Sequence, residues 1–208
     1  MNVHSIPLFP LNLVIFPEGL LPLRIFEMRY LDMVRNCLRN QSSFGVVAVI
    51  ENAAADLNDG LPFANVGTSF TIIDADVTEP GLMNIRCVGQ KRFRVKSAFQ
   101  QEDGLWLGEV EDIENDATMI IPDDLKMTQE YMQQLIQSLS KQDIAEEHLP
   151  FIKPFRIEDC AWVANRWCEI LSMPLIQKQR MLELDSPLVR LELVQDLLSA
   201  EFSTNKRS

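Results

Sequence analysis

The N-terminal segment alternates short apolar runs with prolines. From Ile6 to Tyr30 it carries no charge before Glu18, and four prolines interrupt it: Pro7, Pro10, Pro17 and Pro22. Proline removes a backbone donor and breaks helices, but it is tolerated at the ends and edges of strands. We therefore predict short extended pieces at 6–9, 13–16 and 21–26, with a turn at Glu18-Gly19.

The hydrophobic period changes after this segment. Apolar side chains recur at helical spacing between residues 27 and 40, which predicts one short amphipathic helix. A buried strand is predicted at 44–51 and a loop at 52–62. Further strands are predicted where apolar runs are separated by turn signals such as Gly89-Gln90, and they cover 66–75, 82–88, 93–100 and 105–111.

From residue 119 onward the apolar positions repeat with a helical period. Two stripes cover 131–139 and 163–171, a short helix covers about 175–184, and a last helix opens at Asp185 or Ser186 with Pro187. The pattern predicts an α+β chain. A β-rich subdomain covers 1–118, a helical subdomain covers 119–202, and 203–208 form a disordered polar tail.

Composition and charge narrow the classes of function. The chain is 47% apolar and 24% charged, which is typical of a globular protein, and its formal net charge is −11. Such a charge repels nucleic-acid backbones and anionic lipid, so neither is an expected partner. The apolar run Ser5–Pro17 is shorter than the roughly 20 residues of a membrane-spanning helix, and no basic segment precedes it. We predict a cytoplasmic protein without a membrane segment.

The reactive residue types form no recognisable site. The four cysteines contain no C-x-x-C pair, which favours buried thiols in a reducing compartment. The cluster Glu146-Glu147-His148 is predicted to be solvated surface, because neighbouring residues on a helix do not converge on one point. A G-x-S-x-G motif is absent. We expect no catalytic residues, no metal and no cofactor.

Several segments, in this order along the chain, resemble the N-terminal domain of the Lon ATP-dependent protease. They are Pro7–Val34, Val66–Val95, Leu107–Glu114 and Trp162–Leu198. This domain is also found alone and in the receptor cereblon. The resemblance implies a PUA-like β-barrel with one short helix, followed by a C-terminal helical bundle. It also implies a part in protein-substrate recognition and in hexamer assembly, without catalytic residues.

The sequence departs from full-length Lon in lacking the G-x-x-x-x-G-K-[ST] motif of the ATPase and any counterpart of the peptidase. We therefore predict a non-catalytic module that binds unfolded or flexible polypeptide through apolar contacts. The candidate contact residues are Leu20, Leu21, Phe63 and Trp106. The tryptophans are predicted mainly as core residues rather than as an aromatic cage.

Two alternatives come from other classes of protein. The first is a nucleic-acid-binding PUA-like barrel that uses a basic strand, with Arg92, Arg94 and Lys96 as its contacts. The simpler interpretation of that strand has Phe93 and Val95 facing inward and the three cations in water. The second alternative is an adaptor for one specific partner protein, such as a protease or ligase subunit. The sequence predicts no oligomeric state.

Overall fold

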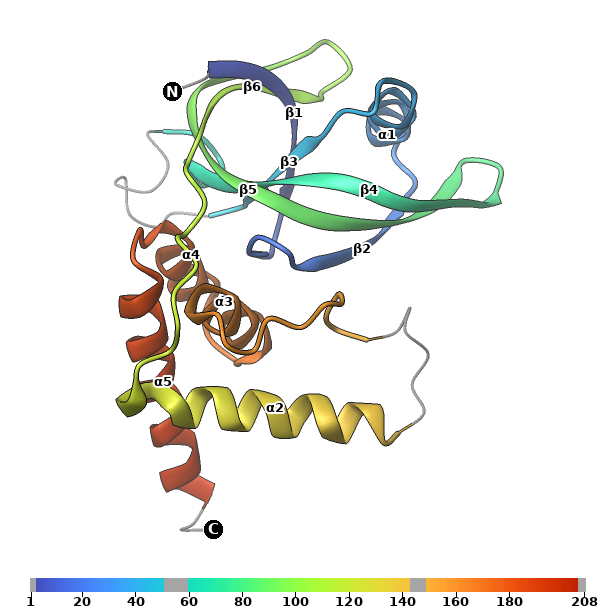
Figure 1. Cartoon of the computed structure of the whole chain (residues 1–208). Helices are drawn as coiled ribbons and strands as arrows, with labels where there is room; N and C mark the ends of the chain where they lie inside the picture. Colours follow the sequence, from blue (N-terminus) through green and yellow to red (C-terminus); the bar gives the residue numbers. More distant parts are fainter. Residues whose placement is uncertain (1–2, 51–59, 143–148, 206–208) are drawn as a thin grey trace. The chain divides into compact units, whose positions relative to one another are not determined.

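The computed structural model describes residues 3–50, 60–142 and 149–205 (Figure 1). Its contacts divide the chain into two compact units. The first contains Met1–Asn115 and Met173–Glu183, and the second contains Asp116–Ser172 and Leu184–Ser208. The predicted division at residue 118 had placed all later helices together, whereas Met173–Glu183 groups with the first unit.

The first unit is built on one mixed sheet, which has six strands in the described residues. They are β1 (Val3–Leu11), β2 (Leu20–Ile25), β3 (Phe44–Ala48), β4 (Val66–Glu79), β5 (Leu82–Gln100) and β6 (Trp106–Asp112). The strand order is β2-β5-β4-β3-β1-β6, with β1 and β3 parallel and the other pairs antiparallel. β5 also pairs with β6, so the pairings that run from β5 through β4, β3, β1 and β6 lead back to β5.

The proline-rich N-terminus forms two strands and not three. The predicted pieces 6–9 and 21–26 fall on β1 and β2, but 13–16 is not a strand. The Thr68 hydroxyl donates to the Ile15 carbonyl at 2.7 Å, so a side-chain hydrogen bond holds this segment in place of a strand ladder. The predicted turn is confirmed, because Glu18 has a φ of 65° and the Gly19 N–H donates to the Phe16 carbonyl at 3.0 Å.

The predicted turn at Gly89-Gln90 is wrong, since β5 continues through it as one long strand. Gly89 instead permits a close approach of two backbones. A Cβ atom at this position would lie 2.6 Å from the Phe16 carbonyl oxygen. The Gly89 carbonyl accepts from the Glu18 N–H at 2.8 Å, and its N–H donates to the Gly19 carbonyl at 2.9 Å. Glycine in a strand interior often marks such a close approach of another backbone.

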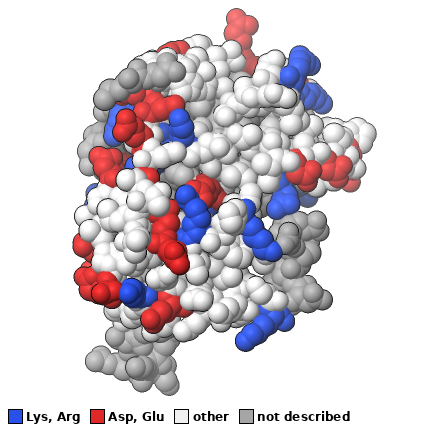
Figure 2. Space-filling model, in the orientation of Figure 1, with Lys and Arg blue, Asp and Glu red and all other residues white. Residues whose placement is uncertain are grey.

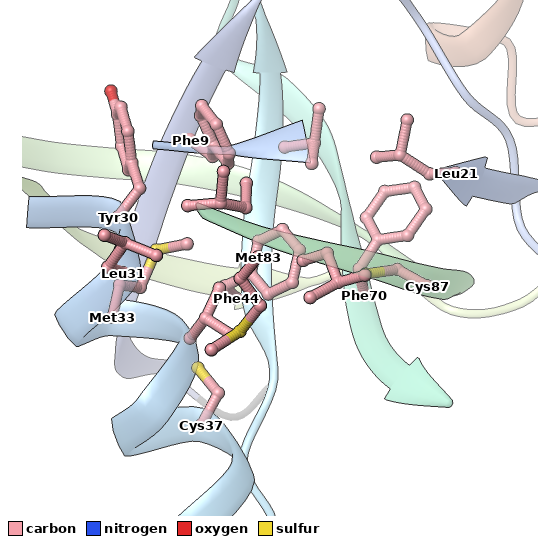
Figure 3. Packing of buried hydrophobic residues seen from close by; sticks show 14 of the residues in the cluster. Phe9, Leu21, Tyr30, Leu31, Met33, Cys37, Phe44, Phe70, Met83 and Cys87 are labelled. Atoms are coloured by element: carbon pink, nitrogen blue, oxygen red, sulfur yellow. The ribbon is translucent and has the colours of Figure 1, made fainter. Parts of the chain in front are cut away.

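The predicted short helix is confirmed as α1 (Met28–Asn40), and its apolar face covers a hydrophobic cluster of the first unit (Figure 3). Phe9 of β1 stacks on Tyr30 of α1, with ring centroids 3.9 Å apart. Phe44 and Phe70 continue the cluster across β3 and β4. Burying a side chain of this kind contributes about 1.5–3 kcal/mol, so α1 is fixed mainly by this face.

The described residues also contain helices at the predicted places. The second unit holds the 3₁₀ turn η1 (Asp123–Leu125) and the helices α2 (Lys126–Ser140), α3 (Cys160–Ile170) and α5 (Pro187–Asn205), while α4 (Leu175–Glu183) belongs to the first unit. The Asp159 carboxylate caps α3 by accepting from the Ala161 N–H at 3.1 Å. α5 continues three residues into the predicted tail.

A buried arginine joins separate segments of the second unit. The Arg190 side chain is fully buried. It donates to Asp116 Oδ2 at 2.6 Å, to Asn165 Oδ1 at 2.9 Å and to the Leu184 carbonyl at 2.6 Å. A buried charge is tolerated when it is paired and hydrogen-bonded in this way. Arg190 therefore fixes the start of the unit against α3 and α5.

Some predictions lie outside the described residues. These are most of the loop at 52–62, the cluster Glu146-Glu147-His148 and the last three residues of the tail. Within the described ranges, none of the helices combines the length and apolar character that a membrane crossing requires.

Candidate functional site

The predicted contact residues lie in the first unit, and two of them are core residues. Leu21 belongs to the cluster under α1. Phe63 is fully buried in a second cluster with Phe93 and Val95, and its ring meets Trp106 edge to face at 5.2 Å. Leu20 and Trp106 are half-buried and keep some exposed area. The structure therefore brings Phe63 and Trp106 together, but as packing partners.

The predicted basic strand is part of β5, and its three cations have different surroundings. The Arg92 side chain is only 3% exposed and donates to the Leu182 carbonyl of α4 at 2.9 Å. Arg94 is exposed, and Lys96 pairs with Glu111 at 2.5 Å. Phe93 and Val95 face inward as predicted. The expectation of three cations in water is wrong for Arg92, because α4 covers that side of the sheet.

A second contact anchors α4 to the sheet. The buried Gln179 amide nitrogen donates to the Val66 carbonyl of β4 at 3.0 Å and to Glu183 Oε1 at 2.6 Å. The spacing of apolar residues predicts the helix α4. Hydropathy gives no signal that a polar glutamine of this helix and an arginine distant in sequence form the contact between α4 and the sheet. Sequence reasoning therefore missed this packing.

The second unit has an apolar groove of about 630 Å³ in its described part. It is lined by Gln133, Ile136, Gln137, Lys153, Pro154, Phe155 and Ile157. One wall is α2, and the other is the segment that precedes α3. Sequence reasoning did not select this groove, although apolar residues around a proline between two helices are a usable signal.

Aromatic packing holds the second wall of this groove. Phe155 lies 6.3 Å from Trp162 and 6.5 Å from Phe151, measured between ring centroids. Trp162 is buried at the start of α3. Trp167 is buried near the end of the same helix, and its indole N–H donates to the Thr128 carbonyl at 3.0 Å. Both tryptophans are core residues, as predicted, and Phe155 is the aromatic that reaches the groove.

The first unit has a smaller polar pocket of about 440 Å³. Its lining includes Ser42, Ser69, Lys91, His4 and Asp112. His4 Nε2 lies 3.9 Å from Asp112 Oδ1, which is longer than a hydrogen bond. Ser69 Oγ is engaged with the Lys91 backbone at 3.2 Å. These residues do not form the nucleophile, base and orienting group that acyl transfer requires.

The cysteines do not form a reactive or metal-binding site. All four are buried free thiols. Burial raises the pKa of Cys87 to about 12 and that of Cys160 to about 11. A thiol nucleophile needs a lowered pKa, so these two are chemically inert at neutral pH. The described residues contain no cluster of His, Cys, Asp or Glu that could hold a metal ion.

Comparisons with known proteins agree with this geometry. The family model of the ATP-dependent protease La (LON) substrate-binding domain matches residues 5–200. Lon protease 2 from Desulfotalea psychrophila is 26% identical over 200 residues, and the match covers 94% of this chain. The chain spans only 25% of that protein.

Solved structures show the same fold. A Lon N-terminal domain protein from Xanthomonas campestris is 32% identical with a TM-score of 0.74, and the match covers 93% of this chain and 98% of that one. The N-terminal domain of a Mycobacterium avium complex Lon protease has a TM-score of 0.63 at 14% identity, covers 94% and 98% of the two chains, and supports the fold alone. On the match over residues 5–200, the chain belongs to the LON substrate-binding domain family.

Proposed function

We propose that this chain is a non-catalytic module that binds unfolded or flexible polypeptide and has neither ATPase nor peptidase activity of its own. The family match over residues 5–200 carries this proposal. We also propose that the ring of strand pairings is a PUA-like β-barrel and that α2, α3 and α5 form a helical bundle. The return of β5 to β6 supports the barrel.

The apolar groove of the second unit is the surface that fits this function best. Ile136, Phe155 and Ile157 keep part of their apolar surface exposed around it. An apolar side chain of a client that enters the groove gains about 25 cal/mol for each Å² removed from water. Unfolded chains expose such side chains and folded proteins bury them. The groove therefore distinguishes the two states without reading a sequence.

The contact residues predicted from the sequence remain part of the proposal where they are accessible. Leu20 and Trp106 keep exposed area in the first unit. Leu21 and Phe63 are buried, so substitutions there change the core before they change any binding surface. A cytoplasmic location is also proposed, and the four free thiols support it.

Fluorescence anisotropy with a labelled, casein-like unfolded chain tests the proposal in the absence of nucleotide. We expect binding at micromolar protein concentration and no hydrolysis of ATP or peptide. The variant Ile136→Ser/Ile157→Ser should weaken binding about tenfold, because two apolar contacts are lost. The matched control Val189→Ser/Leu193→Ser removes exposed apolar side chains from α5 of the same unit and should bind normally. Nucleotide turnover, or no binding of the unfolded chain, would contradict the proposal.

The two alternatives have less support. Nucleic-acid binding on β5 would have Arg92 as a contact, but that side chain is buried against α4. Salt-dependent RNA binding that is lost in Arg94→Glu would support it. An adaptor for one partner protein would co-purify with that partner from cells and would not bind the unfolded chain.

A further inference from the structure

The outer part of β4 is an open sheet edge. β3 pairs with β4 only at Thr68, Ser69 and Phe70. From Thr71 to Glu79 the described sheet gives β4 one neighbour, β5. The backbone donors and acceptors on the other side of this stretch face away from the ladder, and such an edge is a template for an added strand.

The two faces of the sheet at this edge carry different side chains. Cross-strand partners share a face of the sheet, so Ala75 and Val77 lie on the face of their partners Ile85 and Met83, which belong to the core. Val77 is nonetheless 64% exposed at the rim. This face of the edge is therefore apolar.

The opposite face of the edge is acidic. Asp74 and Asp76 are exposed there, with Arg86 and Asn84 as their register partners on β5. Arg86 partly offsets Asp74, whereas Asp76 has a neutral partner. Figure 2 shows acidic side chains gathered at the right of the view, where Figure 1 draws the turn between β4 and β5.

Irregularities in the ladder define the segment that pairs. The register between β4 and β5 shifts between Ile72 and Asp74 and again between Val77 and Glu79. Bulges of this kind twist an edge away from further pairing. Between them the register from Asp74 to Val77 is unbroken, so a short added strand would pair here.

From this geometry we propose that the β4 edge binds an extended polypeptide segment in which basic and apolar side chains alternate. The segment adds a strand beside Asp74–Val77. Its basic side chains lie next to Asp74 and Asp76, and its apolar side chains lie next to Ala75 and Val77. The inference rests on the proposed polypeptide-binding function and names the class of client segment.

Other occupants fit less well. A second copy of this chain pairing through the same edge would place its aspartates beside Asp74 and Asp76, and like charges at neighbouring strand positions are unfavourable. Another open edge of the described sheet, on β2, contains Pro22, which has no backbone N–H to offer. The described edge on β4 contains no proline.

Peptide binding tests the proposal on the full chain. The probe is a fluorescent, end-capped peptide of alternating lysine and valine, and we expect it to bind. One with glutamate in place of lysine should bind at least tenfold more weakly. Two further versions of the lysine peptide keep its sequence and charge. One carries N-methyl groups on the backbone amides of the lysines, and the other carries them on those of the valines. At least one of them should lose binding, because added-strand pairing needs the peptide N–H groups. If both methylated peptides bind as tightly as the unmethylated lysine peptide, the proposal is overturned.

Charge reversal locates the site. Asp74→Lys/Asp76→Lys should weaken binding of the lysine peptide about tenfold and should create binding of the glutamate peptide, since two cross-strand pairs change sign. The control Glu102→Lys/Glu109→Lys makes the same change in net charge at other exposed positions of the unit and should leave both affinities within about twofold. Equal weakening in both variants would overturn the proposal.

The unfolded casein-like chain separates this inference from the proposed function. If wild-type protein binds that chain but not the lysine peptide, the edge proposal is wrong and the function stands. If it binds neither, both are wrong.

Discussion

At the scale of single residues, Arg190 holds the second unit together through one side chain. Arg190→Leu removes three hydrogen bonds and leaves the 7%-exposed Asp116 carboxylate without its cation. We expect a loss of about 3–5 kcal/mol in the free energy of unfolding, measured by urea denaturation. Most of this cost comes from the buried Asp116 charge once the Arg190 cation is removed. Arg190→Leu/Asp116→Leu should therefore be more stable than the single variant. If it is less stable, the charge pair is not the origin of the effect.

Cys87 makes a second prediction at this scale, on pH dependence. Burial, with a smaller contribution from Cys37, raises the pKa of this thiol from 9.0 to about 12. Below pH 9 the thiol is protonated in both the folded and the unfolded chain and has no effect on pH dependence. Above pH 9 the unfolded chain releases the proton first, so stability falls by about 1.4 kcal/mol per pH unit until the folded pKa is reached.

The comparison with Cys87→Ala isolates this effect from other titrating groups. Between pH 8.5 and 10.5, wild-type protein should lose about 2 kcal/mol more stability than the variant. Parallel stability curves for the two proteins would show that the thiol titrates normally in the folded state.

At the scale of elements, Arg92 and Arg94 are two positions apart on β5 but should behave differently. Arg92→Ala removes the hydrogen bond to the Leu182 carbonyl and leaves a cavity beneath α4. We expect a loss of about 2–4 kcal/mol, because a buried acceptor is left without its partner. Arg94→Ala is the matched control, and its effect should lie within about 0.5 kcal/mol, since Arg94 is exposed. Equal stabilities of the two variants would contradict the anchoring role of Arg92.

The elements also show what hydrophobic period can and cannot predict. α1 was predictable because Tyr30, Met33 and Val34 repeat on one face that the core needs. The continuation of β5 through Gly89 was not, because its cause is the approach of a backbone from residues 16–19. Period identifies elements that bury one face, whereas long-range contacts decide where such an element ends.

The same limit applies to the candidate site. The sequence pattern selected Phe63 for its apolar character, but apolar character alone does not separate a core residue from a binding residue. The groove beside Phe155 depends on α2 lying opposite the segment that precedes α3, and an apolar pattern does not show that two such segments face each other. The family resemblance predicted the function class and not its surface, because fold likeness does not place a site.

At the scale of the whole molecule, the order of the chain couples the two units. The sheet of the first unit ends with β6 at Asp112, and the chain enters the second unit at Asp116. It returns to the first unit at Met173, just before α4. While the second unit is folded, its packing restrains the chain between Asn115 and Met173. If that unit unfolds, the segment becomes a long flexible loop, and closing it costs roughly 3 kcal/mol. The docking of α4 on β4 and β5 should therefore weaken when the second unit unfolds.

Hydrogen exchange on Arg190→Leu measures this coupling. In urea concentrations that unfold the second unit of the variant, backbone amides of α4 should exchange faster than in wild-type protein. Amides of β4 and β5 that pair with each other should keep most of their protection, because that ladder does not include α4. Arg92→Ala is the comparison variant. The amides of α4 should exchange faster in it than in wild-type protein, while the amides of α3 and α5 stay protected. Unchanged protection of α4 after the second unit has unfolded would mean that its contacts with the sheet are strong enough to close the loop unaided.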